Sequence, residues 1–164
     1  MGARAGLVVV DASGVIALHA IGRLELLARV YADIVVPAAV WGDVGGLATP
    51  PAPAAVALAS LSGVRIQTPT RLPPVPASLD PGEREAIALA LETRATHVLL
   101  DERAGRRAAS ALRVPVAGTL ALLLRAKQIG ALPAVAPEIA RLRATGFHLS
   151  DELVRRVLAA AGEP

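Results

Sequence analysis

The sequence of 164 residues has no cysteine and few aromatic residues. Without cysteine the chain cannot form a disulfide, a thiolate metal site or a cysteine nucleophile, and this usage fits a reducing compartment. Aromatic residues make up only 2%, and Tyr31, Trp41 and Phe147 are not interleaved with basic residues as in a platform that stacks single-stranded bases. Hydrophobic residues make up 54% of the sequence, and because so few of them are aromatic, the core must consist of Ala, Val, Leu and Ile.

Lysine is also scarce, since Lys127 is the only lysine among 17 basic residues. The net charge of +3 is compatible with a polyanionic partner, but an excess of arginine also arises from ion pairing or coding bias. The apolar run near the start of the sequence is short, and Asp11 interrupts it. We therefore expect neither a signal peptide nor a membrane span, and we expect a cytoplasmic protein.

Two short apolar segments each end at an aspartate. Residues 7–10 (LVVV) precede Asp11, and residues 98–100 (VLL) precede Asp101. Neither segment alternates polar and apolar residues, which predicts strands that are buried on both faces of a sheet. Parallel α/β sheets bind ligands just beyond the carboxyl ends of their strands. Asp11 and Asp101 are therefore expected at one edge of the sheet, where such folds carry their chemistry.

The rest of the chain alternates predicted strands and helices. Pro37 is expected at the first position of a helix that contains Asp43, and the prolines between residues 68 and 81 predict an extended connector. Further strands are expected at residues 34–36, 64–66 and 114–116, and helices at 15–21, 24–30, 38–44, 81–93, 106–112, 119–127, 135–144 and 151–160, with another that ends near 61.

This alternation predicts a three-layer α/β/α sandwich with a mostly parallel central sheet. The length suits one domain over residues 1–164. Residues 132–164 would form a C-terminal helical extension of that domain.

Four acidic residues occupy comparable places, and each also has a purely structural explanation. Asp11 and Asp101 follow strands, where either could cap the next helix. Asp43 lies within a helix that follows a strand, where it could be an ordinary solvated residue. Glu83 lies in the first turn of a helix, where it could form a capping box with Asp80.

Taken together, the four acids indicate a site for a divalent cation. Mg²⁺ and Mn²⁺ prefer carboxylate oxygens, and several unpaired carboxylates at one sheet edge repel one another unless a cation neutralises them. Such a cation would polarise a phosphoryl oxygen and acidify a water molecule for phosphodiester hydrolysis. His19, His97 and His148 lack the spacing of metal ligands, so we interpret them as structural or surface residues.

Four ordered motifs contain these acids, namely residues 8–13 (VVVDAS), 36–43 (VPAAVWGD), 80–90 (DPGEREAIALA) and 99–103 (LLDER). In order and spacing they resemble the PIN domain family, and the resemblance extends over nearly the whole chain. Later segments, residues 116–120, 124–130 and 147–150, are similar to one prokaryotic PIN-like branch. The resemblance implies a metal-dependent ribonuclease fold that is common among toxins of type II toxin–antitoxin pairs.

By position, the resemblance implies that Asp11, Glu83 and Asp101 are ligands of Mg²⁺ or Mn²⁺. Asp43 would be a fourth catalytic acid at a helix position that the family usually fills with Glu, and its side chain is shorter by one methylene. Three more residues would add polar contacts around these ligands, namely Ser13, Glu102 and Thr119. Capping of a helix is the alternative role for Ser13 and Thr119.

Three arginines would bring positive charge close to Asp101, namely Arg103, Arg106 and Arg107. We expect at least one of them to guide the RNA backbone or to stabilise phosphoryl charge. The alternative for each is a solvated or ion-paired helix face.

We therefore expect a PIN-type endoribonuclease, the toxin of a type II pair, with RNA as substrate, an antitoxin protein as partner and a homodimeric assembly. A PIN-like module that binds RNA or protein with little or no catalysis is a second possibility. Residues 11–15 (DASGV) also resemble the first motif of haloacid-dehalogenase-like hydrolases, in which Asp11 would be a covalent nucleophile. Against this third function, Ser13 replaces the second Asp of the phosphatase version, and Lys127 lies far along the chain.

Overall fold

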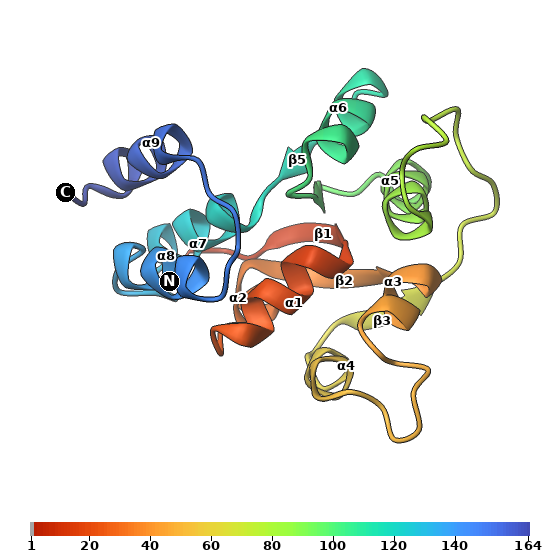
Figure 1. Ribbon diagram of the computed structural model, residues 1–164, viewed down its shortest axis with the longest axis horizontal. Coiled ribbons are helices and arrows are strands. Elements are labelled where there is room, and N and C mark those ends of the chain that lie inside the picture. Colours follow the sequence, from red (N-terminus) through yellow and green to blue (C-terminus); the bar gives the residue numbers. More distant parts are fainter. Residues whose placement is uncertain (1) are drawn as a thin grey trace.

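The computed structural model describes residues 2–164, which form five strands and nine helices that alternate along the chain (Figure 1). The strands are β1 (Ala5–Val10), β2 (Tyr31–Pro37), β3 (Val64–Gln67), β4 (His97–Leu99) and β5 (Val116–Ala117). The helices are α1 (Ala12–Ala20), α2 (Leu26–Val30), α3 (Ala38–Asp43), α4 (Pro53–Ala59), α5 (Pro81–Thr93), α6 (Arg103–Ala111), α7 (Thr119–Gln128), α8 (Ala136–Ala144) and α9 (Asp151–Ala161).

All five strands are parallel and lie in the order β3-β2-β1-β4-β5. The chain adds β2 and β3 on one side of β1 and then crosses to the other side to add β4 and β5. The register pairs Val10, the last residue of β1, with Leu99, the last residue of β4. The junction between β1 and β4 is therefore the topological switch point at which open α/β sheets form their binding crevices.

Two separate apolar clusters cover the two faces of the sheet. Val8 and Val10 belong to a cluster with residues of α1 to α4 and α7 to α9, whereas Val9 belongs to a cluster with residues of α5 and α6. The three valines are completely buried. Because successive strand residues point to opposite faces, a run of consecutive apolar residues is what a sheet between two helical layers requires. The predicted three-layer α/β/α fold is confirmed, and the sheet is entirely parallel.

Some boundaries differ from those expected, for local reasons. Pro37 is the last residue of β2 and has an extended ψ of 145°, so it precedes α3 instead of occupying its first turn. Asp43, expected inside this helix, is its last residue. The fifth strand begins at Val116 because Pro115, inside the expected strand 114–116, has no N–H group to donate to a ladder.

The last two helices belong to the same apolar cluster as β1, through Ile139 and Leu142 of α8 and Val154 and Val157 of α9. The Ser150 side chain caps α9 by accepting a hydrogen bond from the Leu153 N–H at 3.2 Å. Within residues 2–164, no helix has both the length and the apolar character needed to cross a membrane.

Candidate active site

Asp11 is a buried carboxylate directly after β1, with only 5% of its surface exposed. It occupies the N-cap position of α1 but makes no capping hydrogen bond there, so the structural alternative for this residue is wrong. Its Oδ2 accepts a hydrogen bond of 3.4 Å from the Ser13 hydroxyl. The pKa of Asp11 is raised to about 7, mainly by burial. The nearby carboxylates of Asp80 and Glu83 add to the rise, whereas hydrogen bonds from the Ala12 N–H and the Ser13 hydroxyl oppose it.

Asp101 follows β4 and binds the start of α7, not its own helix. Its Oδ1 accepts a hydrogen bond from the Thr119 N–H at 2.8 Å, and its Oδ2 accepts one from the Thr119 hydroxyl at 2.7 Å. Burial raises the pKa of Asp101, whereas Thr119 and then the Arg106 guanidinium act in the opposite direction. Thr119 is completely buried, so it fixes the orientation of the Asp101 carboxylate from within the protein.

Glu83 caps the start of α5, and its carboxylate is also buried near Asp11. The Glu83 N–H donates to Asp80 Oδ1 at 2.8 Å, and the Asp80 N–H donates to Glu83 Oε2 at 3.1 Å, which completes the predicted capping box. The Glu83 side chain is nevertheless 6% exposed. Burial raises its pKa, and the carboxylates of Asp80 and Glu102 add to this effect despite the hydrogen bond from the Asp80 N–H.

Glycines allow these carboxylates to approach the backbone closely. A Cβ atom placed at Gly82 would lie 3.1 Å from Asp43 Oδ2 and 3.3 Å from Asp11 Oδ1, so both side chains reach the first turn of α5. At Gly105 in α6, a Cβ atom would lie 2.7 Å from Glu83 Oε1. The absence of these methyl groups leaves room for the acidic side chains at the edge of the sheet.

Asp43 is exposed at the end of α3, and a glutamate that we did not predict positions this helix. Glu85 of α5 accepts a hydrogen bond from the Ala39 N–H at 2.9 Å, which satisfies a donor in the first turn of α3. Pro37, at the N-cap of α3, provides no side-chain hydrogen bond of its own. Glu85 therefore links α5 to α3, the helix that carries Asp43.

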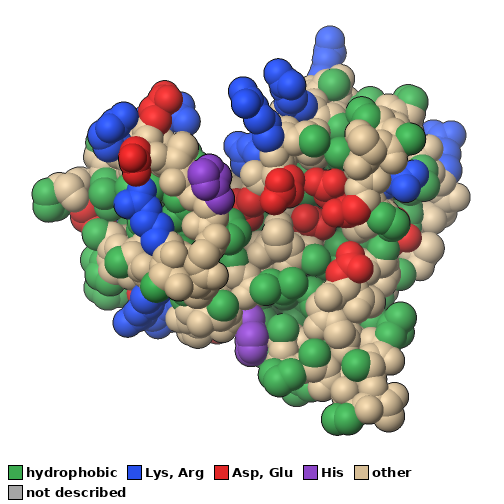
Figure 2. Space-filling view, viewed as in Figure 1, with side chains coloured by type: hydrophobic (Ala, Val, Ile, Leu, Met, Phe, Trp, Pro, Cys, Tyr) green, Lys and Arg blue, Asp and Glu red, His purple; other side chains and the backbone are tan. Residues whose placement is uncertain are grey.

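Positive charge lies beside this acidic cluster, which consists of Asp11, Asp43, Asp80, Glu83, Asp101 and Glu102. Figure 2 shows acidic side chains gathered in the middle of one face, with basic side chains above them around α6. Arg106 donates to the Leu100 carbonyl at 2.9 Å, and Arg103 and Arg107 are exposed. All three arginines line a cleft of about 760 Å³ that also includes Asp101.

Glu102 is exposed at the N-cap of α6 without a capping hydrogen bond, and it acts electrostatically on Glu83 and Asp101. The structure thus brings the predicted acids, Ser13 and Thr119 to one edge of the sheet. Asp80 also belongs to this group of acids. From the sequence we interpret it only as a helix cap, although its negative charge is the feature that indicates a place in the site.

The donor set of the acidic cluster fits a hard divalent cation, because every candidate ligand is a carboxylate oxygen. The buried, mutually repelling carboxylates also provide a reason for a cation to bind. In the conformation described for residues 2–164, however, no set of three His, Asp or Glu side chains is arranged to hold a metal ion. The cluster has the right chemistry and location, and its carboxylates are spread around the edge of the sheet.

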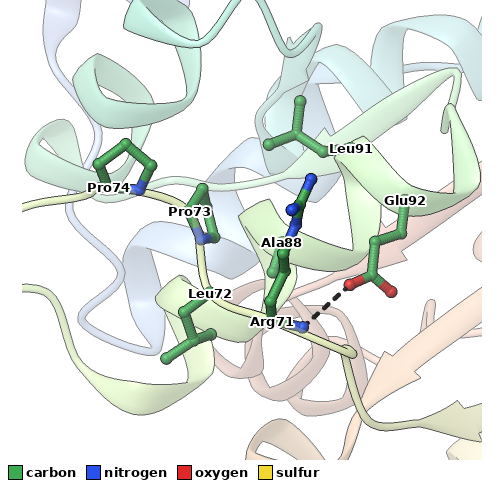
Figure 3. Close-up of a pocket in the computed structure, with 7 residues that line it drawn as sticks. All are labelled: Arg71, Leu72, Pro73, Pro74, Ala88, Leu91 and Glu92. Carbon is green, nitrogen blue, oxygen red and sulfur yellow. Dashed lines mark hydrogen bonds between the residues drawn. The ribbon is translucent and has the colours of Figure 1, made fainter.

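A separate pocket of about 390 Å³ lies between the proline-rich connector and α5 (Figure 3). Glu92 accepts hydrogen bonds from the Thr70 N–H at 2.8 Å, from the Thr70 hydroxyl at 2.7 Å and from the Arg71 N–H at 3.3 Å. The lining includes none of the predicted site residues. This pocket is therefore explained by the attachment of the connector to α5.

A family model described as a PIN domain matches residues 7–163. The chain belongs to the PIN domain family. PIN domains are typically nucleases and generally use divalent metal ions. A PilT N-terminus domain protein from the hyperthermophilic archaeon Sulfolobus solfataricus P2 is similar in structure, with a TM-score of 0.49 and 19% sequence identity over 71% of this chain and 89% of that chain. A search of curated proteins finds no match to this chain.

Proposed function

We propose that this PIN domain is an endoribonuclease that depends on Mg²⁺ or Mn²⁺ and hydrolyses RNA phosphodiester bonds. The observation that carries the proposal is the buried carboxylate of Asp11, whose pKa rises to about 7 beside further carboxylates at the switch point of the sheet. A group of this kind is costly to keep ionised without a counter-charge. A dication supplies that charge, and the family match supports a nuclease.

Within this function, Asp11, Glu83 and Asp101 would hold the ion, and Asp43 would act at the exposed side of the cluster. The bound ion would polarise a phosphoryl oxygen and lower the pKa of the attacking water. Thr119 holds the Asp101 carboxylate in place, and the Ser13 hydroxyl contacts that of Asp11. Arg106, fixed by the Leu100 carbonyl, places a positive charge near Asp101 that would attract the RNA phosphate.

Cleavage of a labelled single-stranded RNA by the chelator-treated protein tests the proposal. Mn²⁺ or Mg²⁺ is expected to restore cleavage, and EDTA is expected to stop it. In metal enzymes, mutation of a residue that only contacts the metal ligands lowers metal affinity or activity by about 10–100-fold. Because Asp11 would itself be a ligand, Asp11→Asn is expected to reduce the cleavage rate by roughly 100-fold or more. Asp33→Asn, at an exposed aspartate of β2 in an ion pair with Arg65, is the matched control and should retain activity.

Metal binding gives a second measurement that does not depend on cleavage. A ligand that binds only the folded state raises its stability. Mn²⁺ is therefore expected to raise the Tm of the wild-type protein and of Asp33→Asn, but not that of Asp11→Asn. Full cleavage by Asp11→Asn, or cleavage that persists in EDTA, would contradict the proposal.

A module that binds RNA or protein without cutting remains the second candidate, because a specific observation favours it. Glu83 and Asp101 already accept hydrogen bonds in the structure, and no three ligands converge on one point within residues 2–164. Such a module would bind the RNA probe and release no product at any metal concentration. The family match gives no support to the haloacid-dehalogenase alternative.

We further propose that the protein acts in the cytoplasm as the toxin of a type II pair, with an antitoxin as its partner and a second copy of the chain in a homodimer. These proposals rest on the resemblance of its motifs to prokaryotic PIN toxins. Induced expression should then arrest growth of a bacterial host, and Asp11→Asn should relieve the arrest. Sedimentation of the purified chain tests the homodimer.

A further inference from the structure

The cleft beside Asp101 is built largely from residues for which the proposed reaction gives no role. One side consists of α6, with Arg103, Arg106 and Arg107. The other side comes from the C-terminal segment, with Phe147 and Arg156. In Figure 2 the surface is hollowed between the α9 region and the α6 region, above the acidic side chains. The two sides lie more than 35 residues apart in the sequence, so only the folded chain forms this surface.

Positive charge dominates the cleft, because it is lined by four arginines and a single carboxylate, that of Asp101. Arg103, Arg107 and Arg156 are exposed, and in the part of the chain that the structure describes their side chains have no ion pair or hydrogen bond. Exposed guanidinium groups without partners can bind phosphates without first breaking a contact within the protein.

Apolar surface lies between these charges. Leu120 and Leu124 of α7, Leu153 and Val157 of α9, and Phe147 also line the cleft. A single-stranded nucleic acid has regularly spaced phosphates and flat, unpaired bases. It matches such a mixture of arginine and apolar surface, because the arginines neutralise its backbone and its bases stack on an aromatic ring. The volume of about 760 Å³ is that of a pocket for small ligands, which suits one strand and not a duplex.

We propose that this cleft binds the single-stranded nucleic acid next to the scissile phosphodiester, with Arg156 contacting a phosphate and Phe147 stacking on a base. The inference rests on the proposed nuclease function and names two positioning residues that the acidic cluster does not include. An acidic peptide would also match the charge of the cleft. A nucleic acid strand is favoured because Asp101, at the cleft, is also a carboxylate that the proposed reaction places at the phosphodiester.

The inference can be tested without cleavage by measuring RNA binding in EDTA. The probe is a labelled single-stranded RNA of 12 nucleotides, and its affinity is measured by fluorescence anisotropy over a series of salt concentrations. Arg156→Gln is expected to weaken binding about fivefold and to reduce the salt slope by about 0.7, the contribution of one phosphate contact on a single strand. Arg155→Gln is the matched control, because Arg155 is exposed on the same helix and does not line the cleft. It is expected to bind like the wild type.

Phe147→Leu tests the stacking contact. Phe147 is partly buried and packs against the apolar core, and leucine keeps an apolar side chain there. The variant is expected to bind the RNA about fivefold or more weakly, with an unchanged salt slope and a Tm close to that of the wild type. Unchanged affinity would overturn the stacking role.

Equal binding by Arg156→Gln and Arg155→Gln would overturn the proposal, and it is the result expected if the cleft binds an acidic peptide. The cleavage assay separates this inference from the nuclease function. Binding that depends on Arg156, without metal-dependent products, would refute the nuclease and support the cleft. Cleavage with binding that is independent of Arg156 would refute the role of the cleft alone.

Discussion

Burial of the Asp11 carboxylate raises its pKa, and this shift has consequences for the cation binding proposed above and for stability. With a pKa of about 7, it is half protonated at neutral pH when no cation is bound. A metal ion must displace this proton, so metal affinity should increase as the pH rises through 7. The same shift makes Asp11 a destabilising group at high pH, because its ionised form is solvated better in the unfolded chain.

In EDTA, Asp11→Asn is expected to be more stable than the wild type by an amount that depends on pH. The folded pKa of Asp11 lies above the ordinary value of 3.8, so the folded state binds more protons between these values and the contribution of Asp11 to stability falls as the pH rises from about 4 to about 7. Asparagine is neutral throughout. Urea unfolding is expected to show a gain in stability of Asp11→Asn over the wild type that is larger at pH 8 than at pH 5. An equal difference at both pH values would contradict the raised pKa.

The second prediction uses the close approach of Gly105 to Glu83. In Gly105→Ala, the new Cβ atom would lie 2.7 Å from Glu83 Oε1, so the flexible carboxylate must move. Alanine is the better helix former by up to about 1 kcal/mol, whereas movement of the buried Glu83 strains its hydrogen bond from the Asp80 N–H, so the two effects on stability oppose each other. We expect reduced metal-dependent cleavage with a Tm close to that of the wild type. Full activity would show that the position of Glu83 is not critical.

At the scale of elements, α3 and α5 are held together by a hydrogen bond between the side chain of one helix and the backbone of the other. Glu85→Ala removes the acceptor of the Ala39 N–H, which is expected to cost about 0.5–2 kcal/mol, as for other caps, and to reduce cleavage by displacing Asp43. Glu85→Gln keeps an acceptor oxygen and should retain most of the stability and most of the cleavage activity. Urea unfolding and the cleavage assay measure these effects, and equal stability of the two variants would argue against the cap.

Elements with local signals could be predicted from the sequence. The capping box of Asp80 and Glu83 and the cap at Ser150 depend on residues three positions apart, and the two strands that end in aspartate show their burial as unbroken apolar runs. These signals were enough to place Asp11 and Asp101 at one edge of a parallel sheet.

Contacts between distant elements could not be predicted in this way. Glu85 lies 46 residues from Ala39. The resemblance to PIN domains places Thr119 near the ligands, but no local pattern predicts its hydrogen bonds to Asp101, 18 residues away. Which donor each carboxylate meets depends on the angle and distance between packed helices, and no local pattern encodes these. For the same reason the arginines of α6 were expected near the site, whereas Arg156 on the opposite side of the cleft was not.

Glu163, which follows α9, attaches this helix to α7 and to the start of α8. The left-handed conformation of Gly162, with φ of 69°, ends α9, and Glu163 then accepts hydrogen bonds from Lys127 Nζ at 2.7 Å, the Val135 N–H at 2.7 Å and the Ala136 N–H at 2.8 Å. The Lys127 ammonium is the main cause that lowers the pKa of Glu163 to about 2. This contact keeps α9, one side of the cleft, in place.

Glu163→Gln is expected to lower the Tm at pH 7. Because the folded pKa lies below the ordinary value of 4.5, the stabilising charge is fully present above pH 4.5 and is lost as the pH falls through about 2. The difference in Tm between the variant and the wild type should therefore shrink over that range. Glu152→Gln, at an exposed position of α9, is the control and should change little. A difference that is constant with pH would contradict this contribution of the charge.

The order of the strands has a consequence for the protein while it is being synthesised. The acidic cluster needs Asp11 after β1, Asp101 after β4, ninety residues later in the sequence, and Thr119 to orient Asp101. A ribosome that has released only the first 90 residues has exposed β1 to β3 but not β4, the strand that carries Asp101 beside Asp11. A growing polypeptide therefore has no complete acidic cluster until β4, Asp101 and Thr119 have emerged, so the proposed activity cannot begin before residue 119 is outside the ribosome.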